Sequence, residues 1–296
     1  MPGPLVYHRT PPALMPLYAK AIWPKSGKAK GEIAIPDLSA KLIGTSTAGN
    51  KLARYQAVCG IARNTSVPLA WPHIMAFPLQ LRLLTDSAFP LPLLGLVHLR
   101  NTITQHREIG IGEILDITVR FGKQESTRRG LEFDLITEAW AAGKLVWEES
   151  SITLFRQPKP VSTTSSNKRE GKKQPPELVQ YPDTLSIEAP ESIGRQYAKV
   201  SGDSNPIHMH ALSAKAFGFP RAIAHGMWSK ARAIALMAQQ DGWKPGPMKV
   251  TCQFKKPLLL PGQAQLNWQA GESGWEYQLL NAKGDAPHLS GYVEWL

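Results

Sequence analysis

The chain has 296 residues, of which 43% are hydrophobic and 19% are charged. This apolar content suffices for a packed core and argues against general disorder. Its two cysteines, Cys59 and Cys252, are too few for a disulfide scaffold and suit a reducing compartment. The first residues lack a secretory signal, and no apolar run approaches the roughly 20 residues of a membrane helix. These features predict a cytoplasmic protein of one or two domains with no membrane partner.

The formal net charge of +11 favours an acidic partner: a nucleic acid, an acidic small molecule or an acidic carrier protein. Much of the excess lies in residues 156–173, which hold six Lys or Arg against one Glu and are rich in Ser, Thr and Pro. No aromatic residue interleaves these charges, so we expect no nucleic-acid partner. The composition instead predicts a flexible basic linker, residues 157–180, between a first unit, 1–156, and a second unit, 181–296.

In the first unit, the pattern predicts a strand near 39–44 and then a helix that runs through Tyr55. An apolar helical region covers 70–89, and Pro78 is expected to break it because an interior proline removes a hydrogen bond. Four segments with strand-like patterns follow. They are residues 96–104, 113–122, 130–137 and 144–155.

The second unit repeats this order. A short alternating strand over 184–188 precedes a helix over 190–200, which Gly202 is placed to end. A polar loop then leads to a second, apolar helix over about 226–240. Four alternating strands follow with hairpin-length connections, so we expect an antiparallel sheet covered by one long helix. These strands centre on residues 248–254, 264–268, 275–279 and 289–295.

Two local matches indicate a real internal repeat. Residues 55–60 share the pattern Tyr-x-x-Val-x-Gly with 197–202, and 68–75 share Pro-x-x-x-x-His-x-Met with 220–227. The first unit is shorter between these landmarks. What it lacks is the polar segment 203–208, so the chemistry is expected in the second unit only.

The polar segment carries an Asp and a His, which together can handle protons. Asp203 and His208 lie on one short loop, where a carboxylate would raise the basicity of an imidazole. His225 and Gly226 then begin the apolar helix, and the Gly226 N–H at the positive helix end suits the oxyanion of an enolate or a thioester carbonyl. An acid–base pair with such a donor is typical of chemistry alpha to a carbonyl.

Simpler interpretations of the same residues stay open. Residues 201–206 also fit an ordinary turn, in which Asp and Asn bond their own backbone. His208, His210 and His225 with Asp203 have a pattern that can bind zinc, since His-x-His places two imidazoles on one side of an extended segment. We nevertheless expect no metal and no other cofactor.

The two segments 197–208 and 219–227 resemble the hydratase-2 signature of the MaoC-like family. The resemblance implies an α+β double hotdog, in which two antiparallel sheets each wrap around a central helix and pair edge to edge. It also implies reversible dehydration of (3R)-3-hydroxyacyl thioesters, or hydration of trans-2-enoyl thioesters. The substrate would be an acyl-CoA or an acyl-ACP, and a homodimer of double hotdogs is an assembly that this fold allows.

By the same resemblance, Asp203 and His208 are the catalytic pair and Asn205 orients them. The N–H of Gly226 polarises the thioester carbonyl. Further candidates for contacting the substrate are Tyr197, His225, Met227, Lys255 and Met75.

The first unit is expected to house the acyl tail. Residues 70–95 are apolar and rich in proline, and a helix broken at Pro78 would leave space that Met75 helps to line. This arrangement predicts a preference for medium or longer acyl chains. His73 has no acidic residue nearby in the sequence, so its role is expected to be structural.

Three alternative functions stay open. A hotdog thioesterase would share the fold and the oxyanion donor but direct water at C1. A non-catalytic acyl-thioester binding protein would show affinity without turnover. A basic nucleic-acid binder would show an affinity that falls steeply with salt.

Overall fold

The computed structural model describes residues 3–22, 33–156 and 178–296, so most of the predicted linker, 157–180, lies outside the described residues. The first unit contains six strands and three helices among its described residues. They are β1 (Leu5–His8), α1 (Leu14–Ile22), β2 (Ser39–Ser46), α2 (Asn50–Cys59), α3 (Trp71–Leu84), β3 (Leu96–Gln105), β4 (Ile114–Thr127), β5 (Gly130–Ala141) and β6 (Lys144–Arg156).

The second unit repeats the order strand, short helix, long helix and four strands. Its described elements are β7 (Asp183–Ala189), α4 (Ile193–Ser201), α5 (Pro206–Met209), α6 (Ala211–Lys215), α7 (Gly226–Met237), β8 (Met248–Phe254), β9 (Gly262–Gln269), β10 (Gly274–Asn281) and β11 (Pro287–Trp295). The strands alternate buried and exposed residues much as their sequence pattern predicts.

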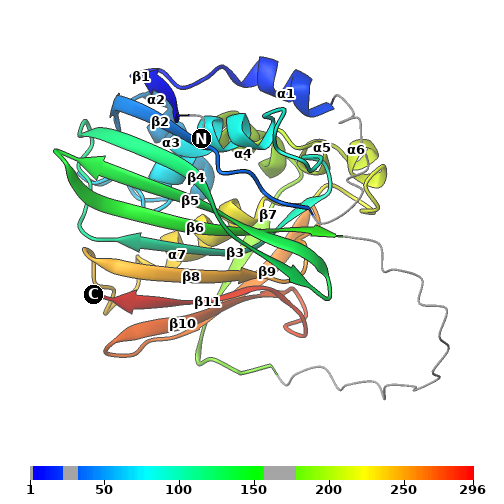
Figure 1. Cartoon of the computed structure of the whole chain (residues 1–296). Helices are drawn as coiled ribbons and strands as arrows, with labels where there is room; N and C mark the ends of the chain where they lie inside the picture. Colours follow the sequence, from blue (N-terminus) through cyan, green and yellow to red (C-terminus); the bar gives the residue numbers. More distant parts are fainter. Residues whose placement is uncertain (1–2, 23–32, 157–177) are drawn as a thin grey trace.

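The strands of both units form one continuous sheet of eleven strands, in the order β1-β2-β4-β5-β6-β3-β8-β11-β10-β9-β7 (Figure 1). The two halves meet where β3 pairs with β8 in antiparallel register, from Arg100 opposite Gln253 to Gln105 opposite Met248. All other pairings are antiparallel except that of β1 with β2. The edge-to-edge arrangement therefore matches the prediction, whereas β1 adds a parallel edge strand that the pattern did not indicate.

The central helix of the first unit is continuous, contrary to the predicted break. Helix α3 runs through Pro78 from Trp71 to Leu84. Its neighbours Ile74 and Leu79 are at most 1% exposed and pack in the hydrophobic core. Burial of a large apolar side chain contributes about 1.5–3 kcal/mol, so several of them offset the ~3 kcal/mol that an interior proline costs.

The second unit agrees with the predicted elements at the end of α4 and differs from them in the polar loop. Helix α4 ends at Gly202, whose φ of 88° lies in the left-handed region, as the glycine predicts. The polar loop after it is partly helical, since Pro206–Met209 form α5. Asn205 caps α5 by accepting the Ile207 N–H, and Pro206 stands at a first-turn position that favours proline.

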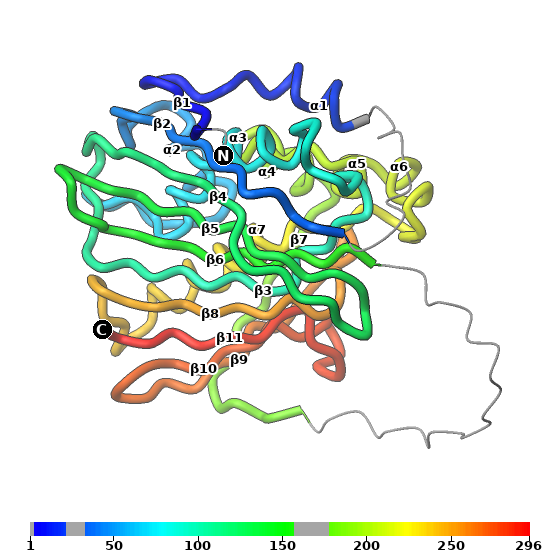
Figure 2. The backbone as a smooth tube through the Cα atoms, in the orientation of Figure 1, coloured from blue at the N-terminus to red at the C-terminus, as the bar shows by residue number. Residues whose placement is uncertain are grey.

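Helix α1 is an element that the sequence pattern did not indicate, and it lies beside the second unit. Figure 2 shows this N-terminal segment, in blue, crossing over the helical side of the molecule. Its Tyr18 hydroxyl donates to the Gly202 carbonyl at 2.6 Å. Among the described helices, none has both the length and the hydropathy to cross a lipid bilayer.

Candidate active site

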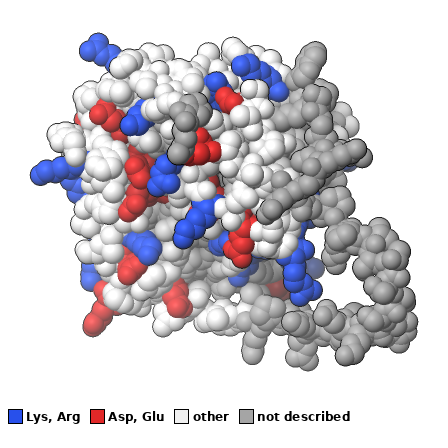
Figure 3. Space-filling model, in the orientation of Figure 1, with Lys and Arg blue, Asp and Glu red and all other residues white. Residues whose placement is uncertain are grey.

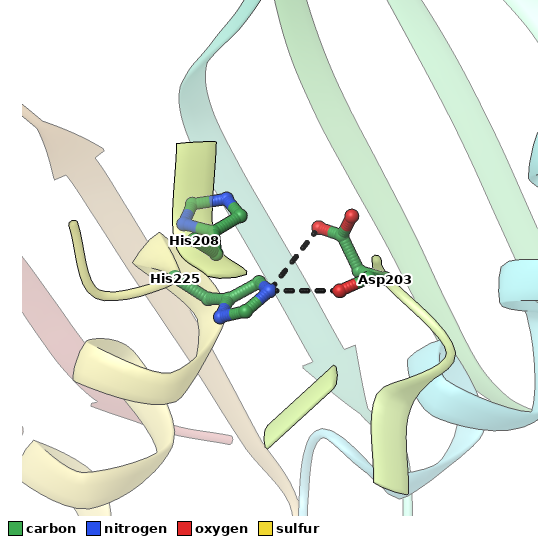
Figure 4. A group of neighbouring side chains, drawn as sticks. All are labelled: Asp203, His208 and His225. Carbon is green, nitrogen blue, oxygen red and sulfur yellow. Dashed lines mark hydrogen bonds and ion pairs between the residues drawn. The ribbon is translucent and has the colours of Figure 1, made fainter. Parts of the chain in front are cut away.

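Three side chains converge beside the end of α4 (Figure 4). Asp203 follows α4, His208 lies on α5, and His225 is the residue before α7. One ligand atom from each of them lies within 4.8 Å of the others. The structure therefore brings together the predicted pair and one of the predicted substrate-contacting residues.

Local backbone geometry sets the direction of the loop. The left-handed Gly202 ends α4 and turns the chain, and the Asp203 carboxylate then accepts the Asn205 N–H at 3.1 Å. Asn205 in turn caps α5, which carries His208. Asn205 thus contributes through its backbone N–H and its capping oxygen, which is how a short Asx-type turn holds a functional side chain.

His208 is held in one tautomer. Its Nδ1 lies 2.8 Å from the Ile223 carbonyl, and because a carbonyl only accepts, Nδ1 must carry the proton. Nε2 of the neutral ring is then free to accept a proton. Burial lowers the pKa of His208, and the opposing effects of Asp203 and the Ile223 carbonyl do not cancel it. Asp203 raises the basicity of His208 as expected, but desolvation penalises the imidazolium more than the carboxylate favours it, so the net pKa is lowered.

His225 is the histidine in direct contact with Asp203. Its Nε2 donates to the Asp203 backbone carbonyl at 3.0 Å and lies 3.8 Å from the carboxylate. Its ring stacks on His208 with centroids 3.7 Å apart. Burial, and next the neighbouring His208, lower the pKa of His225 to about 3. His225 is therefore neutral, and its buried Nδ1 has no hydrogen-bond partner among the described residues.

Asp203 is ionised in this environment. Burial by itself would raise its pKa, but His225, His208 and the Asn205 N–H favour the charged form and lower the pKa below its ordinary value. About a third of its side chain, 34%, is exposed. An accessible carboxylate thus faces two neutral imidazoles.

Asp203, His208 and His225 also form a set that could hold a metal ion by geometry alone. The zinc interpretation from the sequence included His210 as well, but His210 is exposed at the end of α5 and is not part of this set. The absence of a metal from the reaction stays a prediction.

Gly226 begins α7, so its N–H belongs to the first turn, whose donors have no partner within the helix. A Cβ at this position would lie 2.9 Å from the Phe254 ring, so packing of Phe254 requires the glycine. Lys255 follows Phe254 and is exposed. Its position beside Phe254 makes it a candidate for the substrate's anionic carrier.

The remaining candidates lie farther from the reacting groups. The Tyr197 ring packs against His225 with centroids 4.8 Å apart, and its hydroxyl has no partner among the described residues. Met227 is only 6% exposed and belongs to the hydrophobic core. Met75 lies half-buried on α3. Tyr197 therefore borders the site, whereas Met227 serves packing.

Tyr18 is a further residue at this site, and no sequence pattern indicates its role. Its hydroxyl donates to the Gly202 carbonyl at 2.6 Å and accepts the Ser204 N–H at 2.7 Å, so it holds the backbone on both sides of Asp203. Burial raises the pKa of Tyr18, and the Asp203 charge raises it further, which keeps the hydroxyl protonated. No local signal connects position 18 with position 203, so only the folded chain reveals this contact.

His73 has an acidic partner that its sequence neighbourhood does not contain. Its Nδ1 lies 2.9 Å from the Glu149 carboxylate on β6, inside the core. Glu149 also accepts from Asn101, and Asn101 accepts from Lys230 of α7. This buried network links the two units, in keeping with the structural role predicted for His73.

Comparison with known proteins extends these observations. The chain matches the family described as MaoC like domain over residues 165–273. It is 35% identical over 245 residues to 3-hydroxyacyl-thioester dehydratase X of Mycobacterium tuberculosis, which covers 83% of this chain and 85% of that protein. The crystal structure of HtdX from Mycobacterium tuberculosis has a TM-score of 0.73 at 31% identity, covering 87% of this chain and 100% of that one.

A MaoC-like dehydratase from Phytophthora capsici has a TM-score of 0.68 at 17% identity, over 88% of this chain and 96% of that one, and so shares the fold. These likenesses extend over most of the chain, not over the second unit alone. The predicted α+β double-hotdog fold is confirmed. The chain belongs to the MaoC-like family of dehydratases.

Proposed function

We propose that this protein catalyses the reversible dehydration of (3R)-3-hydroxyacyl thioesters and the hydration of trans-2-enoyl thioesters. The observation that carries the proposal is the pairing of an ionised Asp203 with a neutral His208 whose tautomer is fixed. Family membership supports the same chemistry, since the relative from Mycobacterium tuberculosis is named as a 3-hydroxyacyl-thioester dehydratase.

Asp203 and His208 are close enough to share one water. A ring nitrogen of His208 and a carboxylate oxygen of Asp203 lie within 4.8 Å of each other. Two hydrogen bonds of about 2.8 Å through one oxygen span such a separation. In hydration, the pair takes a proton from this water as its oxygen bonds to C3. The same pair then delivers a proton to C2, so the thioester gains one hydroxyl and one hydrogen.

The negative charge that develops on the thioester oxygen needs a donor. The N–H of Gly226 lies in the first turn of α7, where the helix end is positive. His225 contributes by holding the Asp203 backbone through its Nε2. Asn205 contributes by holding the carboxylate. Tyr197 and Lys255 are proposed to contact the substrate.

The carrier of the acyl group is coenzyme A or an acyl carrier protein, both of which are acidic. The chain's net charge of +11 suits either carrier. On the face drawn in Figure 3, basic and acidic residues alternate and form no single basic patch. This mixture supports a small or locally bound acidic partner over a nucleic acid.

The decisive experiment follows the enoyl-thioester absorbance with crotonyl-CoA and with a longer trans-2-enoyl-CoA. We expect the absorbance to fall as water adds, with no free thiol released. Release of coenzyme A at a matching rate would instead support the thioesterase alternative. Binding of both substrates without either change would support a non-catalytic acyl-thioester binding protein.

A second experiment tests whether the reaction needs a metal ion. Prolonged dialysis against a chelator should leave the hydration rate unchanged, because the proposed chemistry uses only protein groups. One zinc per chain, with activity that is lost on its removal and returns on its addition, would assign Asp203, His208 and His225 as ligands instead.

We also propose a domain organisation, a cellular location and an oligomeric state. Units 1–156 and 181–296 with a linker over 157–180 are supported by the repeated element order. A cytoplasmic location is supported by two cysteines that are both free and buried. A homodimer of double hotdogs is to be tested by measuring the mass of the protein in solution.

A further inference from the structure

Helix α6 has no counterpart in the first unit. By the internal repeat, residues 61–67 of the first unit stand against the much longer segment 203–219 of the second. Residues 61–67 are all described and form no helix, whereas 203–219 contain α5, which carries His208, and α6, which carries none of the three converging side chains. Helix α6 is therefore present beside the acid–base pair without belonging to it.

Hydrogen bonds fix α6 relative to α5. The Ser213 hydroxyl on α6 donates to the Pro206 carbonyl at the start of α5, at 2.7 Å. After α6 the chain returns to α5, where the Ile223 N–H donates to the Ile207 carbonyl at 3.1 Å. Figure 1 shows the two helices next to each other at the outer edge of the helical side of the molecule. Helix α6 thus projects from the site on a well-defined loop.

The side chains that α6 and the turn after it present to solvent are mostly apolar. Leu212 is 81% exposed and Phe217 is 38% exposed. Ala211, Lys215 and Ala216 are exposed as well, and Lys215 lies on the same helical face as Leu212 because it follows three residues later. Single exposed apolar residues are ordinary, but adjacent ones form a patch typical of interaction sites. We call these five residues the α6 surface.

The surroundings of the α6 surface are positively charged. No acidic residue occurs in residues 204–240. Arg221 is exposed, and so are Lys255 and Lys256. The segment after the two lysines pairs with residues 222–224, which places them near the start of α7. A positive surface of this kind attracts an acidic partner and repels a second copy of itself.

The shape of the α6 surface distinguishes between acidic partners. Small molecules bind mainly in concave pockets, whereas a projecting helix suits the surface of another protein. Its apolar residues provide an interface core and Lys215 an attraction for a carboxylate. Successive Cα atoms are 3.8 Å apart, so Leu212 lies at most about 15 Å from His208 between Cα atoms. A protein on this surface is close enough to deliver an acyl group on a flexible arm.

We propose that the α6 surface is the docking site for an acidic acyl carrier protein, which makes a carrier protein the preferred donor of the acyl group. The inference rests on the proposed dehydratase function, since it names the carrier that brings the thioester to Asp203 and His208. Leu212 and Phe217 pack against apolar side chains of the carrier protein. Lys215 faces one of its carboxylates.

The first measurement is binding of the unacylated holo acyl carrier protein of the same organism to the full chain, by surface plasmon resonance. The second is hydration of a trans-2-dodecenoyl group carried by that protein or by coenzyme A. The variants are Leu212→Ser and Lys215→Glu. The matched controls in the first unit are Ile114→Ser, at a position 53% exposed on β4, and Lys144→Glu, at an exposed position of β6.

We expect Leu212→Ser and Lys215→Glu each to weaken carrier-protein binding about tenfold, as central interface residues do. The effect of Lys215→Glu should shrink as salt is added, because salt screens exposed charges. Both variants should raise KM for the dodecenoyl carrier protein in parallel and leave kcat and the hydration of dodecenoyl-CoA unchanged. Both controls should behave as the wild type in every measurement.

The proposal is overturned if the wild type does not bind the carrier protein, or if both variants bind it as the wild type does. An equal rise in KM for both thioesters would also overturn it, since the loop would then act on the acyl arm or the catalytic geometry. Binding that depends on Leu212 and Lys215, with neither thioester hydrated by the wild type, would support the docking site and refute the dehydratase function.

Discussion

His73 and His225 occupy equivalent positions in the internal repeat, yet their surroundings differ completely. His225 borders the accessible Asp203 and stacks on His208. His73 is paired with the buried Glu149 and belongs to a network that ties the units together. The same backbone position therefore lies beside the proposed catalytic pair in one unit and in the packed core in the other. The difference comes from the segment 203–208, which supplies a carboxylate and a second imidazole in the second unit only.

The largest expected effect comes from variants in the segment 203–208, which is the segment that distinguishes the two units. Asp203→Asn and His208→Ala should each lower kcat/KM by about 10²–10⁴-fold, because each removes one member of the acid–base pair. The double variant should be little worse than either single one, since both residues act on one water. The measurement is the enoyl-thioester absorbance with circular dichroism to check folding.

Two control variants change the same residue types at other positions. His210→Ala and Asp183→Asn change exposed residues outside the site and should keep wild-type turnover. Wild-type rates in either catalytic variant would contradict the assignment. Loss of activity in His210→Ala would instead assign a role in the reaction to His210.

The second effect is a pH dependence set by His208. The base form of His208 is neutral, and burial lowers its pKa below the ordinary value of 6.5. Activity should therefore persist below pH 6.5 and fall about tenfold per unit only below the lowered pKa. The check is kcat/KM between pH 4 and 9. A fall that begins at or above pH 6.5 would show that His208 is not held neutral.

The third expected effect concerns Tyr18, which contacts the backbone around Asp203 in the second unit. Tyr18→Phe removes both hydrogen bonds that hold the backbone around Asp203. Two such bonds contribute on the order of 1–3 kcal/mol, so we expect kcat to fall about tenfold with little change in KM. Tyr292→Phe, a half-exposed tyrosine on β11, is the control. Equal effects of both variants on kcat would contradict a positioning role.

The smallest effect tests where the acyl tail lies. The predicted break in α3 is wrong, but the preference for medium or longer chains stays a prediction. Met75→Trp should lower kcat/KM severalfold for long enoyl-CoAs and leave crotonyl-CoA unchanged, because the larger ring would occupy space beside α3. A chain-length series on both proteins measures this. Equal losses at all lengths would exclude a tail site beside Met75.

Local patterns in the sequence determined much of the architecture. Alternation of apolar residues located the strands, since the side chains of a strand point to opposite faces in turn. Gly202 located the end of α4 because few other residues adopt a positive φ. The repeat and the extra polar segment showed which unit carries Asp203 and His208. Apart from the repeat, which compares two distant segments, each of these signals lies within a few residues along the chain.

The tertiary structure decided what depends on distant residues. Helix α3 continues through Pro78 because burial against the sheet outweighs the proline's cost. Asp203 contacts His225 instead of His208, and Tyr18 holds the loop from a helix that no periodicity indicated. Glu149 reaches His73 from another strand. Such partners meet only when the chain folds, because a hydrogen bond between distant segments leaves no pattern in the sequence around either residue.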